Sequence, residues 1–243
     1  TFLMMAAWFW LNGGINPASE INGLLTSLVF MGITGALLVK DLDRPDRFLY
    51  VLLRPQWKSW LVRGAYILVG FGGLITIKLF DSYFGWGLFW LMIPGAILAI
   101  LGAVYTAFLF GQARGRDLWQ STGLCAVHML VHSVMAGSVS MMAIVPETSV
   151  WMANVLLWGI ILNMCIMAKE ILKPHDTPDT RKAIHLMTKG YYSKYFWAGI
   201  VFGSIAPIVM INTFADTITL IAGGVALVGI ILTEFVRIRV PQM

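Results

Sequence analysis

The chain has 243 residues, of which 58% are hydrophobic and only 12% are charged. The charged share is about half of that in soluble domains, so composition excludes a soluble globular protein and predicts an integral membrane protein. The net charge of +5 reports membrane topology in such a chain and gives no reason to expect nucleic acid as a partner. The two cysteines, Cys125 and Cys165, form no CxxC pair and no metal-ligand cluster, so we predict no iron–sulfur site.

Apolar runs of roughly 20 residues recur along the chain, and each is long enough to cross a bilayer core. The first run ends at Asn12 and is too short to span, so we interpret it as the second half of a helix that begins before Thr1. The first run and seven further helices predict an all-α polytopic membrane protein with eight crossings, the first of them truncated. The seven further helices are expected at about 19–39, 57–80, 86–112, 118–145, 150–172, 194–214 and 217–236.

Proline and glycine mark the bounds and contacts of these helices. Asp81–Gly85 are predicted to form a short turn, and Pro94 predicts a kink. In the longest polar connector, Thr177–Asp179 (Thr-Pro-Asp) predict the start of a short helix at the membrane surface. Gly199 and Gly203 form a GxxxG pair, which predicts close packing against another helix.

Basic residues gather in alternate connectors. All 17 Lys and Arg residues except Lys78 fall in or beside the connectors 40–64, 113–117 and 173–194, or near the C-terminus. The positive-inside rule therefore predicts that these connectors and the C-terminus are cytoplasmic.

The connector 40–64 alternates acidic and basic residues and contains Arg44-Pro45 and Arg54-Pro55. Each proline pushes the preceding arginine out of helical geometry. An arginine held in this way presents a rigid fork to a carboxylate, a polar head group or a partner protein. The alternative is a solvated loop that orients the helices by its charge.

His128 and His132 lie four residues apart near the middle of a membrane helix, and therefore on one face. They are candidates for binding a quinone oxygen or relaying protons, and the alternative is a pair of hydrogen-bonded core histidines. A bis-histidine haem needs ligands from different helices. The other two histidines, His175 and His185, lie in a polar connector, so we predict no haem.

Tyr105 lies near the predicted cytoplasmic end of its helix, and its hydroxyl is a candidate donor to a quinone carbonyl. A buried tyrosine with a structural partner is the alternative. Glu170 and Glu234 close two helices on the same predicted side, where they are either proton acceptors or simply solvated or paired carboxylates. The candidate docking residues for a partner protein are Arg54, Arg114 and Arg116.

These residues combine into two candidate sites. A lipid-soluble redox carrier that enters from the membrane would meet apolar walls, a hydroxyl, a few charges and a proton route. The candidate quinone-binding residues are Tyr105, Asp41, Arg44, Arg47 and His128. The candidate proton path comprises His128, His132, Glu170 and Glu234.

Four segments resemble the NrfD/PsrC family, which comprises membrane subunits of polysulfide reductase and also occurs in alternative complex III. The segments are DLDRPDRF (Asp41–Phe48), RPQWKSWLVRGAYIL (Arg54–Leu68), YTAFLF (Tyr105–Phe110) and GYYSKYFWAGIVFGSIAP (Gly190–Pro207). The resemblance covers nearly the whole chain, which we interpret as a single integral membrane domain over residues 1–243.

The resemblance implies two four-helix bundles in a prokaryotic cytoplasmic membrane. It implies an anchor that is not catalytic alone, binds menaquinone or ubiquinone as an exchangeable substrate and holds no haem or metal. It also implies an iron–sulfur subunit as partner, with a molybdopterin or multihaem redox subunit beyond it. Electrons would pass between quinone and cluster, and some members are thought to translocate protons.

Two alternatives remain. The predicted second helix has no acid between Asn22 and Val39, where some relatives have one, which favours a structural anchor or a proton-conducting subunit that binds no quinone. A secondary transporter is disfavoured because the sequence shows no clear internal repeat and no pair of broken helices.

Overall fold

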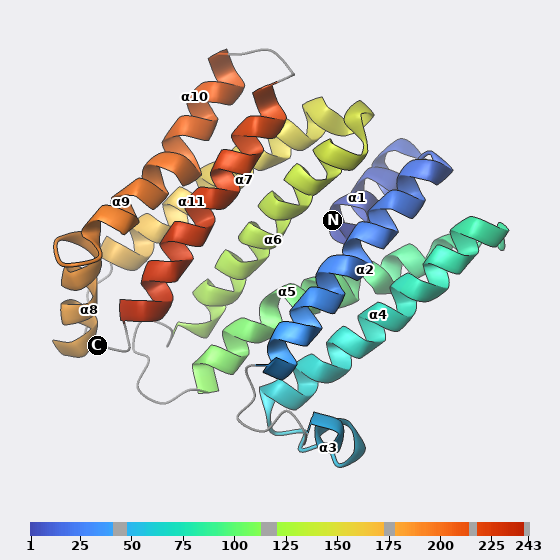
Figure 1. Ribbon diagram of the computed structural model, residues 1–243, viewed down its shortest axis with the longest axis horizontal. Coiled ribbons are helices and arrows are strands. Elements are labelled where there is room, and N and C mark those ends of the chain that lie inside the picture. Colours follow the sequence, from blue (N-terminus) through green and yellow to red (C-terminus); the bar gives the residue numbers. More distant parts are fainter. Residues whose placement is uncertain (41–47, 113–120, 173–177, 214–217, 241–243) are drawn as a thin grey trace. The chain divides into compact units, whose positions relative to one another are not determined.

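The structure is a computed structural model that describes residues 1–40, 48–112, 121–172, 178–213 and 218–240. All regular secondary structure in these ranges is helical (Figure 1). Among the described residues, seven helices are long and apolar enough to cross a membrane, and Phe2–Asn12 is a shorter apolar helix. These findings confirm the predicted all-α membrane protein with about eight membrane helices.

The chain divides into two compact units, Thr1–Gln112 (unit 1) and Ala113–Met243 (unit 2). Each unit contains four long or apolar helical passages, which matches the two predicted four-helix bundles. Unit 1 comprises α1 (Phe2–Asn12), α2 (Pro17–Lys40), α3 (Phe48–Leu53), α4 (Trp60–Phe84), η2 (Phe89–Leu91) and α5 (Met92–Gln112). Unit 2 comprises α6 (Thr122–Ile144), η4 (Pro146–Thr148), α7 (Ser149–Leu172), α8 (Pro178–Thr188), α9 (Ser193–Ile200), η5 (Val201–Ile205), α10 (Ala206–Thr213) and α11 (Thr219–Arg239).

In unit 1, α4 packs between α2 and α5, and α1 packs on α5 and α2. Two sequence predictions about this unit were wrong. Asp81–Gly85 do not form a turn, because α4 continues to Phe84 and ends at Gly85, whose φ of 71° belongs to the left-handed region that glycine tolerates best. Pro94 does not kink a helix, because it lies in the first turn of α5, where its missing N–H has no partner to lose.

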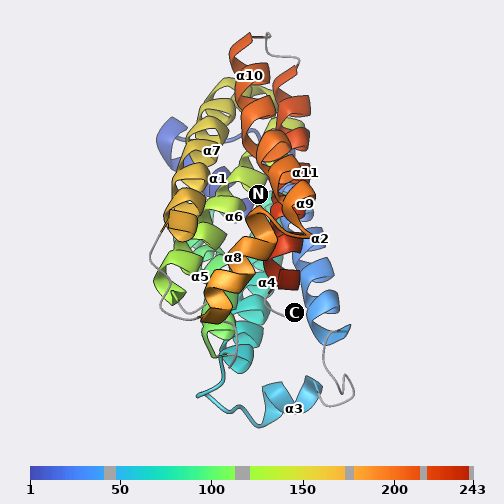
Figure 2. The same ribbon diagram turned by 90° about the vertical axis from the view of Figure 1, so that its left-hand side faces the viewer.

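In unit 2, α6 packs along α7, and the passage α9–η5–α10 packs along α11 (Figure 1). The short helix α8 lies at one end of the unit and is inclined to the long helices (Figure 2). It begins at Pro178, as predicted, and buries Ala183 and Met187 against Phe196 and Val236. Its polar face is exposed, so α8 is amphipathic, as expected of a helix at a membrane surface.

The helical passage α9–η5–α10 contains a π-helical stretch, Val201–Ile205, directly before Pro207. Pro207 has no N–H to donate four residues back, so the helix loses a regular hydrogen bond at this place and widens. Gly203 lies in the widened turn and packs against Gly229 of α11, while Gly199 packs against Thr233. The GxxxG pair therefore makes the close helix contact that the sequence predicted.

Large apolar side chains cover much of the outer surface of the helices. Phe30 on α2, Ile97 on α5 and Trp158 on α7 are more than half exposed. Exposing such a surface to water would be energetically unfavourable, whereas contact with apolar lipid tails is not. The buried positions, by contrast, include several charged and polar side chains, and these define the candidate site.

Candidate functional site

Arg237 on α11 is the centre of a buried polar cluster in unit 2, with only 7% of its surface exposed. Its Nη2 donates to both carboxylate oxygens of Glu170 on α7, at 2.9 and 2.8 Å. Its Nη1 donates to Glu234 Oε1 at 3.1 Å and to Nδ1 of His128 on α6. One guanidinium therefore joins three helices and two carboxylates, in the forked geometry for which arginine is suited.

The two histidines of α6 meet on a single amide oxygen. Oδ1 of Asn163 on α7 lies 2.7 Å from His128 Nε2 and 3.0 Å from His132 Nε2. The two rings are 4.2 Å apart, and His132 Nδ1 lies 3.7 Å from Glu234 Oε1. His128 is fully buried, and both of its ring nitrogens have partners. The predicted proton-path residues His128, His132, Glu170 and Glu234 thus lie in one connected cluster.

His128, His132 and Glu234 offer ligand atoms that all lie within 4.8 Å of one another, which raises the question of a metal ion. Arg237 Nη1 contacts two of the three groups, His128 Nδ1 and Glu234 Oε1. The guanidinium already supplies positive charge at this place and occupies the lone pair that His128 would give to a metal. The donor set therefore fits a guanidinium-centred network better than a metal centre.

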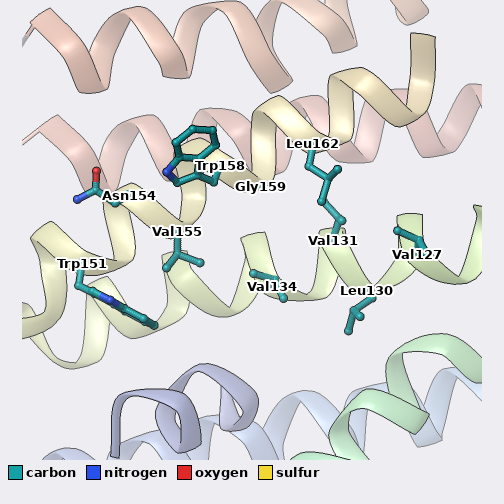
Figure 3. Close-up of a pocket in the computed structure, with 10 residues that line it drawn as sticks. All are labelled: Val127, Leu130, Val131, Val134, Trp151, Asn154, Val155, Trp158, Gly159 and Leu162. Carbon is teal, nitrogen blue, oxygen red and sulfur yellow. The ribbon is translucent and has the colours of Figure 1, made fainter. Parts of the chain in front are cut away.

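An apolar pocket of about 520 Å³ lies between α6 and α7. Figure 3 shows the residues that line it, which are valine and leucine side chains of α6 together with Trp151, Asn154, Val155, Trp158, Gly159 and Leu162 of α7. Ligand pockets for small molecules have volumes of this order, roughly 300–1,000 Å³. In the chain, pocket residues stand directly before members of the cluster: Val127 before His128, Val131 before His132 and Leu162 before Asn163. The pocket and the cluster therefore use different faces of the same helical turns.

Tyr105 of α5 is buried in unit 1, with its ring directly against Gly64 of α4. A Cβ atom added to Gly64 would lie 2.3 Å from Tyr105 Cδ2, which is far closer than atoms can approach. The absence of a side chain at Gly64 therefore allows the Tyr105 ring to pack directly against the backbone of α4.

We expect Gly64→Ala to displace the Tyr105 ring and to lower the stability of unit 1 by about 1–3 kcal/mol, as overpacking does in protein cores. Gly70→Ala and Gly73→Ala are the matched controls, because they lie on the same helix with nothing within 4 Å of the added Cβ. Thermal unfolding in detergent, followed by Tyr and Trp fluorescence, measures the difference. Equal unfolding temperatures for Gly64→Ala and the two controls would contradict the packing described here.

The described end of the connector 40–64 is held by specific hydrogen bonds. Gln112, at the end of α5, accepts from the Trp60 N–H and donates to the Lys58 carbonyl, both at 3.0 Å. The Arg63 Nε donates to the Trp57 carbonyl at 2.6 Å, and the Tyr66 hydroxyl donates to Leu52 at 2.6 Å. This part of the connector is therefore fixed to the ends of α4 and α5, whereas the side chain of Arg54 is exposed.

Unit 1 contains a second buried ionic cluster at the far end of α4. Lys78 is only 1% exposed, and its Nζ lies 2.6 Å from Asp81 Oδ2 and 2.8 Å from Glu20 Oε1. The other Asp81 oxygen accepts the Leu88 N–H at 2.8 Å. Lys78, which lies outside the basic connectors, can be buried because two carboxylates neutralise it there.

Comparison with known proteins supports the resemblance over the full chain. The sequence model of the family described as "Polysulphide reductase, NrfD" matches residues 2–243. The chain belongs to the NrfD family. No curated protein and no solved structure matches it. NrfD proteins are membrane subunits of quinone-linked reductases and usually partner with iron–sulfur subunits, so this chain has the general role of a membrane anchor in such complexes.

The structure of this NrfD protein places some of the predicted site residues and leaves others open. Asp41, Arg44, Arg47, Arg114 and Arg116 lie outside the described residues, so their assigned roles stay predictions. Tyr105 belongs to unit 1 and His128 to unit 2.

Neither Asn163 nor the central role of Arg237 was predicted from the sequence. Arg237 was counted as a charge of the C-terminal tail, but α11 continues to Arg239 and buries Arg237. Two signals were available in the sequence. Arg237 follows Glu234 by three residues, which places both on one helix face, and Asn163 is a polar residue in an otherwise apolar stretch.

Proposed function

We propose that this NrfD-family chain is the quinone- or quinol-reactive anchor of a multi-subunit respiratory oxidoreductase. Menaquinone or ubiquinone would be its exchangeable substrate. Electrons would pass between the quinone and an iron–sulfur subunit, with a molybdopterin or multihaem subunit beyond it. Protons released or taken up by the quinone would move through groups of this chain, in a prokaryotic cytoplasmic membrane with the basic connectors on the cytoplasmic side.

One observation supports this proposal, namely that unit 2 combines a cluster of titratable side chains with an apolar pocket on the same helical turns. Two-electron reduction of a quinone consumes two protons, so a quinone site needs groups that exchange protons close to apolar walls that accept an isoprenoid tail. His132, Glu234 and Glu170 supply the first requirement. The pocket between α6 and α7 supplies the second.

The candidate quinone ligands His128 and Tyr105 differ in whether their polar atoms already have hydrogen-bond partners. Both ring nitrogens of His128 are engaged, by Asn163 and Arg237, so a quinone oxygen would have to displace one of them. Tyr105 retains its hydroxyl as a candidate donor, in a ring pocket shaped by Gly64. We therefore assign Tyr105 as the first residue to test for quinone binding.

We expect Tyr105→Phe to lower kcat/KM for quinol oxidation or quinone reduction by about tenfold, the effect of losing one hydrogen bond of about 1.4 kcal/mol. The assay uses the purified complex in detergent with short-chain quinone analogues, together with extraction and quantification of bound quinone. Tyr83→Phe is the matched control, because Tyr83 is exposed near the end of α4. Unchanged turnover in Tyr105→Phe, together with a complex that contains no quinone, would contradict the proposal.

The charged cluster of unit 2 also favours a second function, a proton-conducting or structural subunit that binds no quinone itself. The buried groups that exchange protons in unit 2 are joined across three helices without needing a ligand. A density map of the assembled complex separates the two functions. Quinone density in this subunit supports the first, and quinone density only in another subunit supports the second.

A further inference from the structure

The hydrogen-bond partners of the Arg237 cluster determine which nitrogens carry protons. A guanidinium donates hydrogen bonds and cannot accept them. Arg237 Nη1 lies closer to His128 Nδ1 than to Nε2, which is 3.4 Å away, so Nδ1 is the acceptor and the unprotonated nitrogen of a neutral ring. It follows that the His128 proton is on Nε2.

This assignment fixes the orientation of Asn163. Since His128 Nε2 is a donor, its partner must be the amide oxygen, as the structure has it, at 2.7 Å. The Asn163 amide nitrogen then points the other way, toward the Met167 sulfur at 3.8 Å. His132 Nε2 lies 3.0 Å from the same oxygen and must also donate. His132 Nδ1 is then the one ring nitrogen of the pair whose protonation state these contacts do not fix.

His132 Nδ1 faces Glu234 Oε1 across 3.7 Å. If His132 is neutral and Glu234 is ionised, two acceptors face each other at a distance too long for a hydrogen bond. A proton on either atom turns this repulsive pair into a donor and an acceptor. The same Glu234 oxygen receives a hydrogen bond from Arg237 Nη1 at 3.1 Å, which holds it in place for either state.

The charge of the cluster also favours one added proton. The titratable and charged groups that face one another here are Cys125, His128, His132, Glu170, Glu234 and Arg237. With neutral cysteine and histidines, one arginine and two ionised glutamates leave a net charge of −1. A net charge in a largely buried site within a membrane is costly, and one proton removes it.

We propose that His132 Nδ1 and Glu234 together form a binding site for one exchangeable proton, from which Arg237 and Asn163 exclude His128. The step is a proton transfer alone: a proton from water or from a quinol binds at His132 Nδ1, where it faces the Glu234 carboxylate, and leaves by the same atom. Arg237 and Asn163 are positioning residues, because they act through the two histidines. The inference deepens the proton-transfer part of the proposed function, but its test needs no quinone, so the two can fail separately.

The test is nitrogen NMR of the complex, or of the full chain in lipid nanodiscs, with ¹⁵N-labelled histidine between about pH 5 and about pH 9. The chain has four histidines, and His→Gln variants assign their signals. We expect His128 to show a neutral, Nε2-protonated ring throughout, and His132 to titrate. We expect Glu234→Gln to move the His132 titration by one pH unit or more, and Glu147→Gln, at an exposed carboxylate, to leave it unchanged.

Two results would overturn the proposal in the wild-type protein alone: titration of His128, or a His132 ring that keeps one protonation state over the whole pH range.

A further test, with a double variant, addresses the positioning role of Arg237. The double variant Glu170→Gln/Arg237→Met removes a cation and its paired carboxylate together, which avoids leaving either one unpaired. We expect His128 to begin to titrate in this variant, and an unchanged His128 spectrum would contradict the assignment of Arg237.

Discussion

Replacing Arg237 with methionine is expected to destabilise the protein by about 3–5 kcal/mol, the cost of leaving buried charges without their partner. The wild-type guanidinium makes two hydrogen bonds to Glu170, one to Glu234 and one to His128. Methionine fills similar volume but offers no donor, so both carboxylates must find protons or water inside the helix bundle. Thermal unfolding of the purified protein in detergent or nanodiscs measures the loss.

Two controls separate loss of the ionic network from loss of a charge or a long side chain. Arg239→Met removes an exposed arginine two residues further along α11, and we expect it to change stability by less than about 0.5 kcal/mol. The double variant Glu170→Gln/Arg237→Met removes one carboxylate with the guanidinium, so we expect it to be more stable than Arg237→Met alone. If Arg237→Met and Arg239→Met unfold at the same temperature, Arg237 does not stabilise the bundle in the way the structure indicates.

The course of the chain through the membrane could be predicted from the sequence, because the signal for it is dense and local. Runs of roughly 20 apolar residues are needed to cross a bilayer, and proline and charge interrupt them. The ends of the helices were harder to predict where one residue type is compatible with two local structures. A proline such as Pro94 can kink a helix or lie in its first turn. An aspartate such as Asp81 can follow the end of a helix or lie buried within it in an ion pair with lysine. Which outcome occurs depends on residues that are distant in the sequence.

The candidate site could be predicted only in part for the same reason. His128, His132, Glu170 and Glu234 were identified one by one as ionisable groups in apolar helices, which is a property of each residue alone. These residues form one cluster because α6, α7 and α11 pack against one another. The spacing of residues in the sequence does not show which helices are in contact. Arg237 was missed because its position near the C-terminus resembles that of a solvated topology charge.

The largest expected effect outside the polar cluster comes from Gly229→Ala on α11. An added Cβ at Gly229 would lie 2.0 Å from the Gly203 nitrogen and 2.1 Å from its Cα. These are backbone atoms, which cannot rotate out of the way as a side chain can, so α11 and the α9–η5–α10 passage must move apart. Overpacking of cores costs about 1–3 kcal/mol and occasionally more, and we expect this variant at or above the upper end of that range.

The helix pair provides its own graded controls. At Gly203 an added Cβ would meet the Gly229 backbone at 3.2 Å, so we expect Gly203→Ala to destabilise less than Gly229→Ala. At Gly224, also on α11, nothing lies within 4 Å, and we expect Gly224→Ala to be neutral or slightly stabilising because alanine favours helix. Thermal unfolding should therefore rank the three variants in this order. If Gly229→Ala unfolds at the same temperature as Gly224→Ala, the two helices do not approach at Gly203 and Gly229, and the π-helical turn before Pro207 would need another explanation.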